Sequence, residues 1–273
     1  MSQFRSSLMN LPPVVKNLLI INVLMLLVTS VVGDRFGFNI DRLLALHFPL
    51  SEYFRPHQFV THMFMHGGIG HLFFNMFALF MFGRVLESVW GPKRFLIYYM
   101  VTGLGAAALH TFVGWLDYSS MKAAANAFAN TPTPDLMLDF IREHMGRVQP
   151  WVTDFVNSWA ENPSNAYDTQ KAIAMVNQMI TENINVPTVG ASGAVFGILL
   201  AFGMLFPNTE LMLIFPPIPI KAKYFVIGYG LIELFMGVQN QSGDNIAHFA
   251  HLGGMLFGFV LIKIWQKNSK NFY

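Results

Sequence analysis

The chain has 273 residues, of which 53% are hydrophobic and only 12% are charged, whereas an ordinary soluble domain carries about 25% charged residues. The formal net charge is +2, so the excess of basic residues typical of a nucleic-acid-binding protein is missing. The sequence has no cysteine, which excludes disulfides, cysteine-ligated metals and cysteine nucleophiles.

Six apolar runs of roughly 15 to 22 residues predict an all-α polytopic membrane protein, because each run is close to the ~20 residues of a bilayer-spanning helix. In chain order they occupy residues 18–32, 69–89, 95–115, 189–206, 222–238 and 246–265. We interpret the first as a retained helix rather than a signal peptide, since no small-residue cleavage site follows it. We therefore expect a single membrane domain over residues 1–273.

The distribution of charge predicts the orientation of the spans. With the N-terminus inside, the inner segments hold ten basic residues against the acidic Glu87 and Glu210, namely Arg5, Lys16, Arg84, Lys93, Arg94, Lys221, Lys223, Lys263, Lys267 and Lys270. Seven basic and twelve acidic residues fall in the outer segments. By the positive-inside rule both termini are cytoplasmic.

Residues 117–187 form one large polar insertion between the third and fourth spans, with four basic and eight acidic residues. Apolar residues recur within it at mainly helical spacing on both sides of Pro150. This pattern predicts two amphipathic helices that lie on the outer leaflet or pack over the bundle. A folded spacer without chemistry and a segment that selects substrates are both consistent with the pattern.

Polar residues inside three of the spans carry the functional signal, because a polar side chain in hydrocarbon is costly unless it is paired or faces water. His71 and Asn75 share one face of the second span, Ser192 opens the fourth, and His251 lies in the sixth. All three spans enter from the outer face. At ~1.5 Å per residue these side chains lie at a similar depth.

Glycines predict how closely those spans pack. Gly193 with Gly197, and Gly254 with Gly258, form small-xxx-small pairs in the fourth and sixth spans, and such pairs let helix backbones approach closely. Packing through these faces would bring Ser192 within hydrogen-bonding reach of a histidine. That arrangement is typical of nucleophilic catalysis, in which the imidazole takes the serine proton.

These residues resemble a known family. His71-x-x-x-Asn75, Gly190-Ala191-Ser192-Gly193 and Ala250-His251-x-x-Gly254-x-x-x-Gly258 look like the three signature motifs of the rhomboid intramembrane serine proteases, in the same order and spans. The resemblance implies a Ser192–His251 dyad without a third acidic residue. It also implies an oxyanion hole made by the side chains of His71 and Asn75 and the backbone N–H of Ser192, with no metal or other cofactor.

His248 competes with His251 for the role of base, since it lies three residues earlier on nearly the same face. The family pattern places glycines three and seven residues after the base, and Gly254 and Gly258 satisfy it for His251. We therefore assign the base to His251 and expect His248 at the wet mouth of the cavity. His62 and His66 precede the second span and are expected to bond the loop and line a water path.

The chain departs from the family pattern at three places. Many members carry Trp-Arg in the first outer loop where His57-Gln58 stands here, so the usual anchoring of that loop is not expected. Phe196 stands where a tyrosine is common, and its ring can still stack on the imidazole of His251. The insertion over residues 117–187 is also longer than the corresponding family loop.

Other classes of protein fit the sequence less well. A histidine metal site lacks a His-Glu-x-x-His motif, and no acidic residue flanks these histidines inside a span. An aspartyl protease needs two buried aspartates, which no span holds. A transporter is suggested only by the lone Glu233, without repeated halves. A catalytically silent rhomboid-like protein that binds membrane clients is the most serious alternative, although such relatives typically lack the serine or the histidine.

We therefore expect a membrane serine endopeptidase whose partners are the lipid bilayer and single-span transmembrane substrates, cut near their outer ends. The resemblance and the absence of eukaryotic targeting signals place it in a bacterial cytoplasmic membrane. Substrate identity and oligomeric state do not follow from the sequence.

Overall fold

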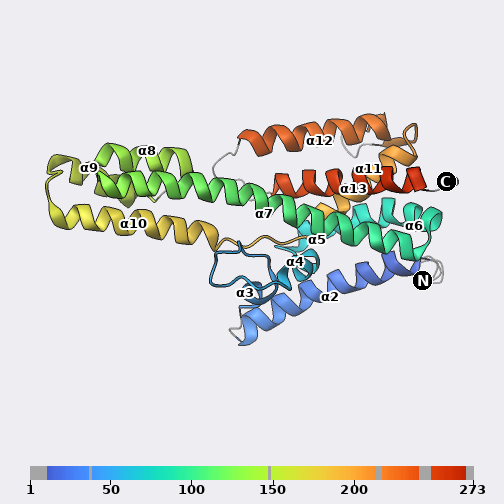
Figure 1. Cartoon of the computed structure of the whole chain (residues 1–273). Coiled ribbons are helices and arrows are strands. Elements are labelled where there is room, and N and C mark those ends of the chain that lie inside the picture. The colour runs from blue at the N-terminus through green and yellow to red at the C-terminus, as the bar shows by residue number, and fades with distance from the viewer. Residues whose placement is uncertain (1–10, 37–38, 147–148, 213–216, 240–246, 269–273) are drawn as a thin grey trace.

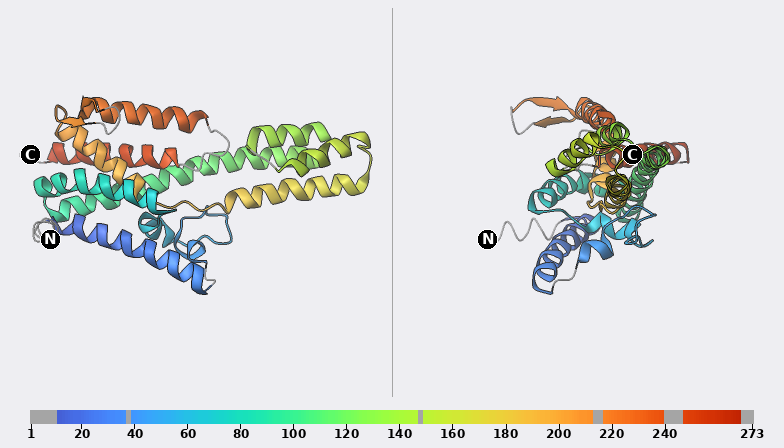
Figure 2. Two further views of the ribbon diagram at one scale, coloured as in Figure 1. Left: turned by 180° about the vertical axis from the view of Figure 1, so that it is seen from behind. Right: turned by 90° about the vertical axis from the view of Figure 1, so that its left-hand side faces the viewer.

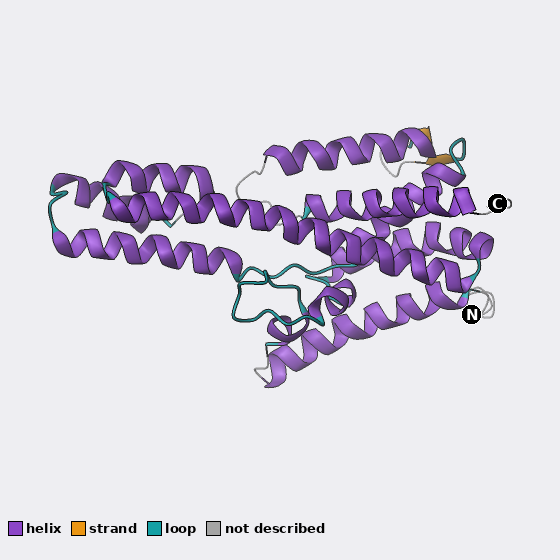
Figure 3. Ribbon diagram, viewed as in Figure 1, coloured by secondary structure: helices purple, strands orange, loops and turns teal. Residues whose placement is uncertain are grey.

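The computed structural model of the chain describes residues 11–36, 39–146, 149–212, 217–239 and 247–268, and these are overwhelmingly helical (Figures 1 and 3). In chain order the elements are α2 (Pro13–Phe36), α3 (Ile40–Leu44), α4 (Gln58–Thr61), the 3₁₀ turn η1 (His62–Phe64), α5 (Ile69–Ala78), the π-helical η2 (Leu79–Gly83), α6 (Arg84–Trp90), α7 (Pro92–Asn130), α8 (Pro134–His144), α9 (Pro150–Glu161), α10 (Ala166–Ile184), α11 (Ser192–Leu205), β1 (Glu210–Met212), β2 (Pro219–Lys221), α12 (Ala222–Gln239) and α13 (His248–Asn268).

Each of the six predicted spans coincides with helix. Among the described residues, four helical segments are long and apolar enough to cross a membrane, namely Pro13–Val31, Ile69–Trp90, Pro92–Asn130 and His248–Lys267. Helix α11 is apolar but shorter, with 14 residues, and α12 has 18 residues. The predicted start of the sixth span at residue 246 lies outside the described residues. An all-α polytopic membrane fold is confirmed.

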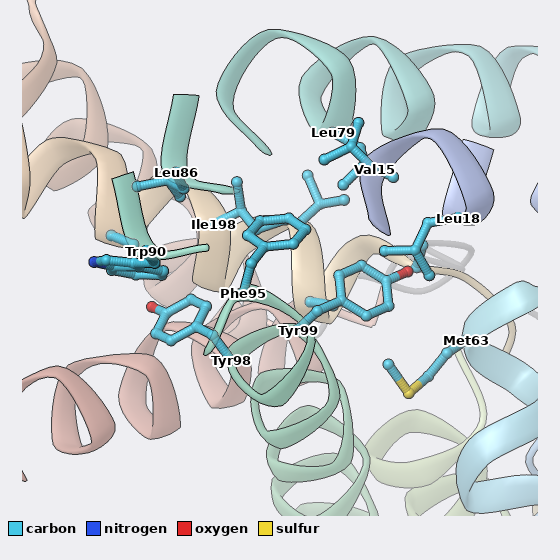
Figure 4. Packing of buried hydrophobic residues seen from close by; sticks show 14 of the residues in the cluster. Val15, Leu18, Met63, Leu79, Leu86, Trp90, Phe95, Tyr98, Tyr99 and Ile198 are labelled. Carbon is cyan, nitrogen blue, oxygen red and sulfur yellow. The ribbon is translucent and has the colours of Figure 1, made fainter. Parts of the chain in front are cut away.

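The centre of the bundle is formed by α7, α11 and α13, with α2, α5, α6 and α12 around them. Figure 4 shows its core, where the fully buried rings of Phe95, Tyr98 and Tyr99 on α7 pack near Ile198 of α11. The hydroxyl of Tyr98 donates to the carbonyl oxygen of Gly197 at 2.8 Å. A buried phenol needs such a partner, so this bond ties α7 to α11 at one register.

Helix α2 is held at the side of the bundle by a buried acid. The two carboxylate oxygens of Glu87 accept the backbone N–H groups of Val14 and Val15 at 2.9 and 2.8 Å. These N–H groups lie in the first turn of α2, where a helix offers them no internal partner, and a negative charge there is stabilising. The charge distribution predicts Glu87 in an inner loop, whereas the structure buries its side chain inside the bundle.

The outward faces of the outer helices are apolar. Helix α2 exposes Ile20, Leu24, Leu27 and Val28, and α12 exposes a similar row that includes Ile227, Leu231 and Phe235. Contiguous exposed apolar surface of this extent is unusual for a soluble protein and fits contact with lipid.

The insertion forms a helical lobe that continues α7 beyond the bundle (Figures 1 and 2). The two expected amphipathic helices are α8 and α9, but α10 and the extension of α7 to Asn130 were not expected. The lobe lies at the end of the bundle opposite to the start of α2 and the end of α13, and projects away rather than covering the bundle. The lobe can project because the apolar faces of its helices pack against one another in a second apolar core. This core is formed by Met121, Ala125 and Phe128 of α7 with Met137, Phe140, Ile141, Val152, Val156, Trp159, Ala172, Met175, Val176 and Ile180.

A two-stranded antiparallel sheet precedes α12, with Leu211 of β1 opposite Ile220 of β2. It lies at the end of the bundle opposite the lobe (Figure 3).

Candidate active site

Ser192 is the first residue of α11, and the chain before it is held by backbone bonds. The N–H of Gly190 donates to the carbonyl oxygen of His62 at 2.9 Å, and Leu46 and Thr188 exchange N–H···O bonds of 3.0 and 2.8 Å. The hydroxyl of Thr188 also meets Nε2 of His110 on α7 at 2.8 Å. The loop that precedes Ser192 is therefore hydrogen-bonded to three other segments, which carry Leu46, His62 and His110.

Gly190 is required at its position for two reasons. Its φ is +132°, a conformation that residues with a side chain rarely adopt. A Cβ there would also lie 2.9 Å from Nε2 of His71 and 3.5 Å from Oγ of Ser192. The imidazole of His71 and the hydroxyl of Ser192 thus approach the same small space beside the Gly190 backbone.

The first turn of α11 presents donors to that space. Ala191 occupies the cap position and makes no side-chain cap bond. The first backbone bond inside the helix runs from the N–H of Val195 to the carbonyl oxygen of Ala191 at 3.0 Å. Because the N–H groups before it have no intrahelical acceptor, the positive end of the helix dipole faces the serine.

His71 is oriented by its own loop. Its Nδ1 accepts the backbone N–H of Gly67 at 3.4 Å, which assigns the ring hydrogen to Nε2. The nitrogen beside Gly190 and Ser192 is therefore a donor, as an oxyanion site requires.

Asn75 is buried on the same helix, but its amide is used locally. Its Nδ2 donates to the carbonyl oxygen of His71 at 3.0 Å, one turn back. The structure thus places Asn75 beside the site residues without directing its described hydrogen bond to Ser192, and its oxyanion role stays a prediction.

His251 lies over the face of α11 that carries Ser192. Its ring stacks on that of Phe196 with centroids 4.1 Å apart and an interplanar angle of 7°, which confirms the stacking expected for Phe196. Since Phe196 follows Ser192 by one helical turn, the imidazole and the serine share one side of the α11–α13 contact.

The close approach of α11 and α13 depends on their glycines. A Cβ on Gly254 would overlap the carbonyl oxygen of Gly193 and lie 2.7 Å from its carbonyl carbon. The expected contact between the two spans is therefore confirmed at this pair. Gly197 and Gly258 instead face α7, where they meet Thr102 and Tyr98.

The structure adds one residue to the site that sequence reasoning left aside. Oε2 of Glu233 on α12 accepts from Nδ1 of His251 at 2.8 Å and from Nδ1 of His248 at 2.6 Å. All three side chains are buried. The expectation that no acidic residue flanks these histidines inside a span is wrong, because α12 turns its lone acid inward. The signal was present, since an acid within an apolar span is by default a functional candidate.

The same three residues have the chemistry of a metal site. Their ligand atoms lie within 4.8 Å of one another, and imidazole nitrogens with a carboxylate oxygen suit zinc. The two nitrogen-to-oxygen distances are both below 3 Å and also fit direct hydrogen bonds between the imidazoles and the carboxylate.

His62 and His66 stand at the entrance to the second span. Burial lowers the pKa of His62 to about 4 and that of His66 to about 4, so both rings are neutral near pH 7. Nδ1 of His62 donates to the carbonyl oxygen of Gln58 at 2.8 Å, and the ring of His66 lies edge-on to that of His71 at 5.1 Å.

Gln58 anchors the loop between α2 and α5. Its buried amide donates to the carbonyl oxygens of Arg42 and Tyr53 at 3.1 and 2.9 Å, while its Oε1 accepts the N–H groups of His47 and Arg55 at 3.2 and 3.1 Å. Where many members of the family that the motifs resemble carry Trp-Arg, this chain thus has one glutamine with four backbone partners.

Comparison with known proteins supports the family seen in the motifs. A family model described as a rhomboid domain matches residues 53–129 and 166–268, more than half of the chain and with the tip of the lobe omitted.

Three relatives carry rhomboid names. An uncharacterised mitochondrial rhomboid protein of Schizosaccharomyces pombe is 25% identical over 241 residues, which cover 86% of this chain and 58% of the relative. The mitochondrial RHOMBOID-like protein 12 of Arabidopsis thaliana is 28% identical, with 73% of this chain and 44% of the relative covered. A provisionally named rhomboid protease of Bacillus subtilis is 28% identical, with 53% and 65% covered. The chain thus spans about half the length of the two mitochondrial relatives.

These names do not support a bacterial cytoplasmic membrane as the location, because two of the three relatives are mitochondrial. The match to the rhomboid domain and the long apolar helices together establish an integral membrane protein.

Proposed function

This chain belongs to the rhomboid family of intramembrane proteases and related proteins, and on that premise we propose that it is a serine endopeptidase that hydrolyses peptide bonds in or near transmembrane segments. The observation that carries the proposal is the backbone contact between Gly193 and Gly254. This contact sets the helix that begins at Ser192 against the helix that carries His251.

In the acylation step, Oγ of Ser192 attacks the carbonyl carbon of the scissile bond, and its proton passes to Nε2 of His251. The developing oxyanion is stabilised by Nε2–H of His71 and by the backbone N–H groups of the first turn of α11. His251 then gives the proton to the leaving amine. The product is an ester between Ser192 and the N-terminal part of the substrate.

Deacylation needs water at the same ester. His251, neutral again, takes a proton from water as the hydroxide attacks, and the serine recovers its hydrogen when the ester breaks. His66 supports a water route, since it is buried beside His71 and its two ring nitrogens have no bond to protein groups in the described part of the chain. A polar ring of this kind suits a path for water through apolar surroundings.

The substrates we propose are single-span membrane proteins, cut near the outer end of their transmembrane segment in the lipid bilayer. Small or helix-breaking residues there would let the segment unwind into the site. The outward-facing orientation rests on the charge bias of the loops, and the membrane in which the protein resides stays a prediction.

Cleavage of a model transmembrane substrate by the purified protein in liposomes tests this function. We expect the parent to cut and both Ser192→Ala and His251→Ala to be silent. Ser119→Ala is the matched control, because this half-buried serine donates to the carbonyl oxygen of Trp115 within its own helix, and its loss should leave cleavage unchanged. A parent that is folded but neither cuts nor reacts with a fluorophosphonate at Ser192 would instead support a silent protein that binds membrane clients.

A further inference from the structure

Helix α12 is attached to the bundle by few residues, and one of them is charged. Its buried positions are Ala222, Val226 and Glu233, while most of its length is exposed. A carboxylate in the middle of an apolar segment is costly unless it finds partners. Glu233 has such partners, because its carboxylate accepts hydrogen bonds from two imidazoles of α13.

The contact with Glu233 determines which nitrogen of His251 can act as a base. A carboxylate only accepts hydrogen bonds, so Nδ1 of His251 carries the ring hydrogen. Nε2 is then unprotonated in the neutral ring and is the nitrogen able to receive the proton of Ser192. Without this partner the imidazole could adopt the other tautomer, which cannot serve as the base at Nε2.

Two contacts together fix the orientation of the ring. Stacking on Phe196, at 4.1 Å and 7°, fixes its plane, and the 2.8 Å bond to Glu233 fixes the rotation within that plane. Helix α12 supports both contacts, since Tyr229, one turn before Glu233, touches the ring of Phe196 at 4.9 Å.

The charge of Glu233 matters at the moment of proton transfer. When Ser192 loses its proton to Nε2, the imidazole of His251 becomes a cation in apolar surroundings. A carboxylate 2.8 Å from Nδ1 pairs with that cation, as in serine proteases that use a third acidic residue.

We propose that Glu233 is a positioning residue that acts through His251, so that this rhomboid uses a Ser192–His251–Glu233 triad in place of a dyad. The inference rests on the proposed function. His248 holds the shared Oε2 from the other side at 2.6 Å and so keeps the carboxylate in place, rather than acting as the base.

The experiment measures the rate at which a fluorophosphonate labels Ser192, together with kcat and KM for a transmembrane substrate. Glu233→Gln keeps the size of the side chain and removes its charge. We expect labelling and kcat to fall on the order of 100-fold, with KM and melting temperature little changed. Glu233→Asp keeps the charge and should recover part of the rate, which a purely structural role would not predict.

Glu87→Gln is the matched control. It is also a buried glutamate within the bundle that accepts two hydrogen bonds, but these come from the first turn of α2. We expect it to lower the melting temperature and leave the labelling rate of the folded protein unchanged. If Glu233→Gln does not fold, Glu233→Asp decides, since a shorter arm should slow labelling without raising KM.

Four outcomes would overturn the inference. Labelling of Glu233→Gln at the parent rate would leave Ser192 and His251 as a dyad with the proposed function intact. Equal losses in the Gln and Asp variants that follow the melting temperature would make the residue structural. Loss of labelling on adding a chelator would make the cluster a metal site. A folded parent that is not labelled at all would overturn the proposed function and the triad with it.

Discussion

Replacing Gly254 by alanine should separate the two helices that carry the serine and the histidine. The added Cβ would overlap the carbonyl oxygen of Gly193, and it would lie 2.7 Å from the carbonyl carbon and 3.3 Å from Cα of that residue. An ordinary contact is 3.4–4 Å. All three atoms belong to backbone in the first turn of α11, so no side-chain rotation relieves the overlap.

The helices must therefore move apart by on the order of 1 Å. Overpacking of this kind costs about 1–3 kcal/mol, and a displacement of about 1 Å between reacting groups lowers rates about 100-fold. We expect Gly254→Ala to melt at a lower temperature in detergent and to lose about 100-fold in kcat, measured by cleavage of a transmembrane substrate and by labelling of Ser192.

Gly228→Ala is the matched control, because a Cβ at this position of α12 has no neighbour within 4 Å. This variant should keep the parent's activity and can gain stability, since alanine favours helix by about 1 kcal/mol over glycine. If Gly254→Ala matched the parent in both melting temperature and kcat, the close contact of α11 and α13 would not position the site.

Three further predictions concern the surroundings of the site. Gln58→Ala should leave four backbone groups of the first outer loop without their partner and destabilise the loop by about 1–3 kcal/mol. An added protease should then cut this loop faster, and proteolysis at the parent's rate would contradict the anchoring role of Gln58. Because burial lowers the pKa of His62 and His66 to about 4 in the folded state while free imidazoles titrate near 6.5, the unfolded state binds more protons between these values. The contribution of these histidines to the free energy of unfolding should therefore be fully present above about pH 6.5 and be lost towards pH 4, by about 3 kcal/mol for His62. A melting temperature that does not change over this range would refute their burial as neutral rings. Trp159→Ala should loosen the lobe by about 3–5 kcal/mol, so that hydrogen exchange rises in α8–α10 while labelling of Ser192 stays constant; a parallel loss of labelling would show that lobe and site are coupled.

Much of the fold follows from local sequence pattern. The spans are visible because apolar runs of sufficient length have few alternatives to membrane helices. Gly193 and Gly254 predict a close helix contact because small residues let backbones approach, and the structure places these two residues against each other. Amphipathic spacing likewise predicts α8 and α9, although it does not show that they would bury their apolar faces against an extension of α7.

Only part of the candidate site can be predicted from the sequence. Ser192, His251 and His71 stand out because polar residues in apolar spans are rare. The amide of Asn75 bonds within its own helix, which no spacing rule distinguishes from a bond to the site. Gln58 replaces the usual loop anchor through backbone partners up to 16 residues away, and their identity depends on how the loop folds back.

Glu233 shows most clearly what tertiary structure decides. By sequence it is a lone acid, 15 residues before His248 and 18 before His251. Composition and periodicity place it in a span but do not say towards which neighbour that face of the helix turns. The direction is decided by the packing of α12 against α13, because only the desolvated contact with two imidazoles makes a buried carboxylate tolerable. The sequence alone thus determines the helices and most of their reactive groups, while the partner of the histidine is determined by how the helices meet.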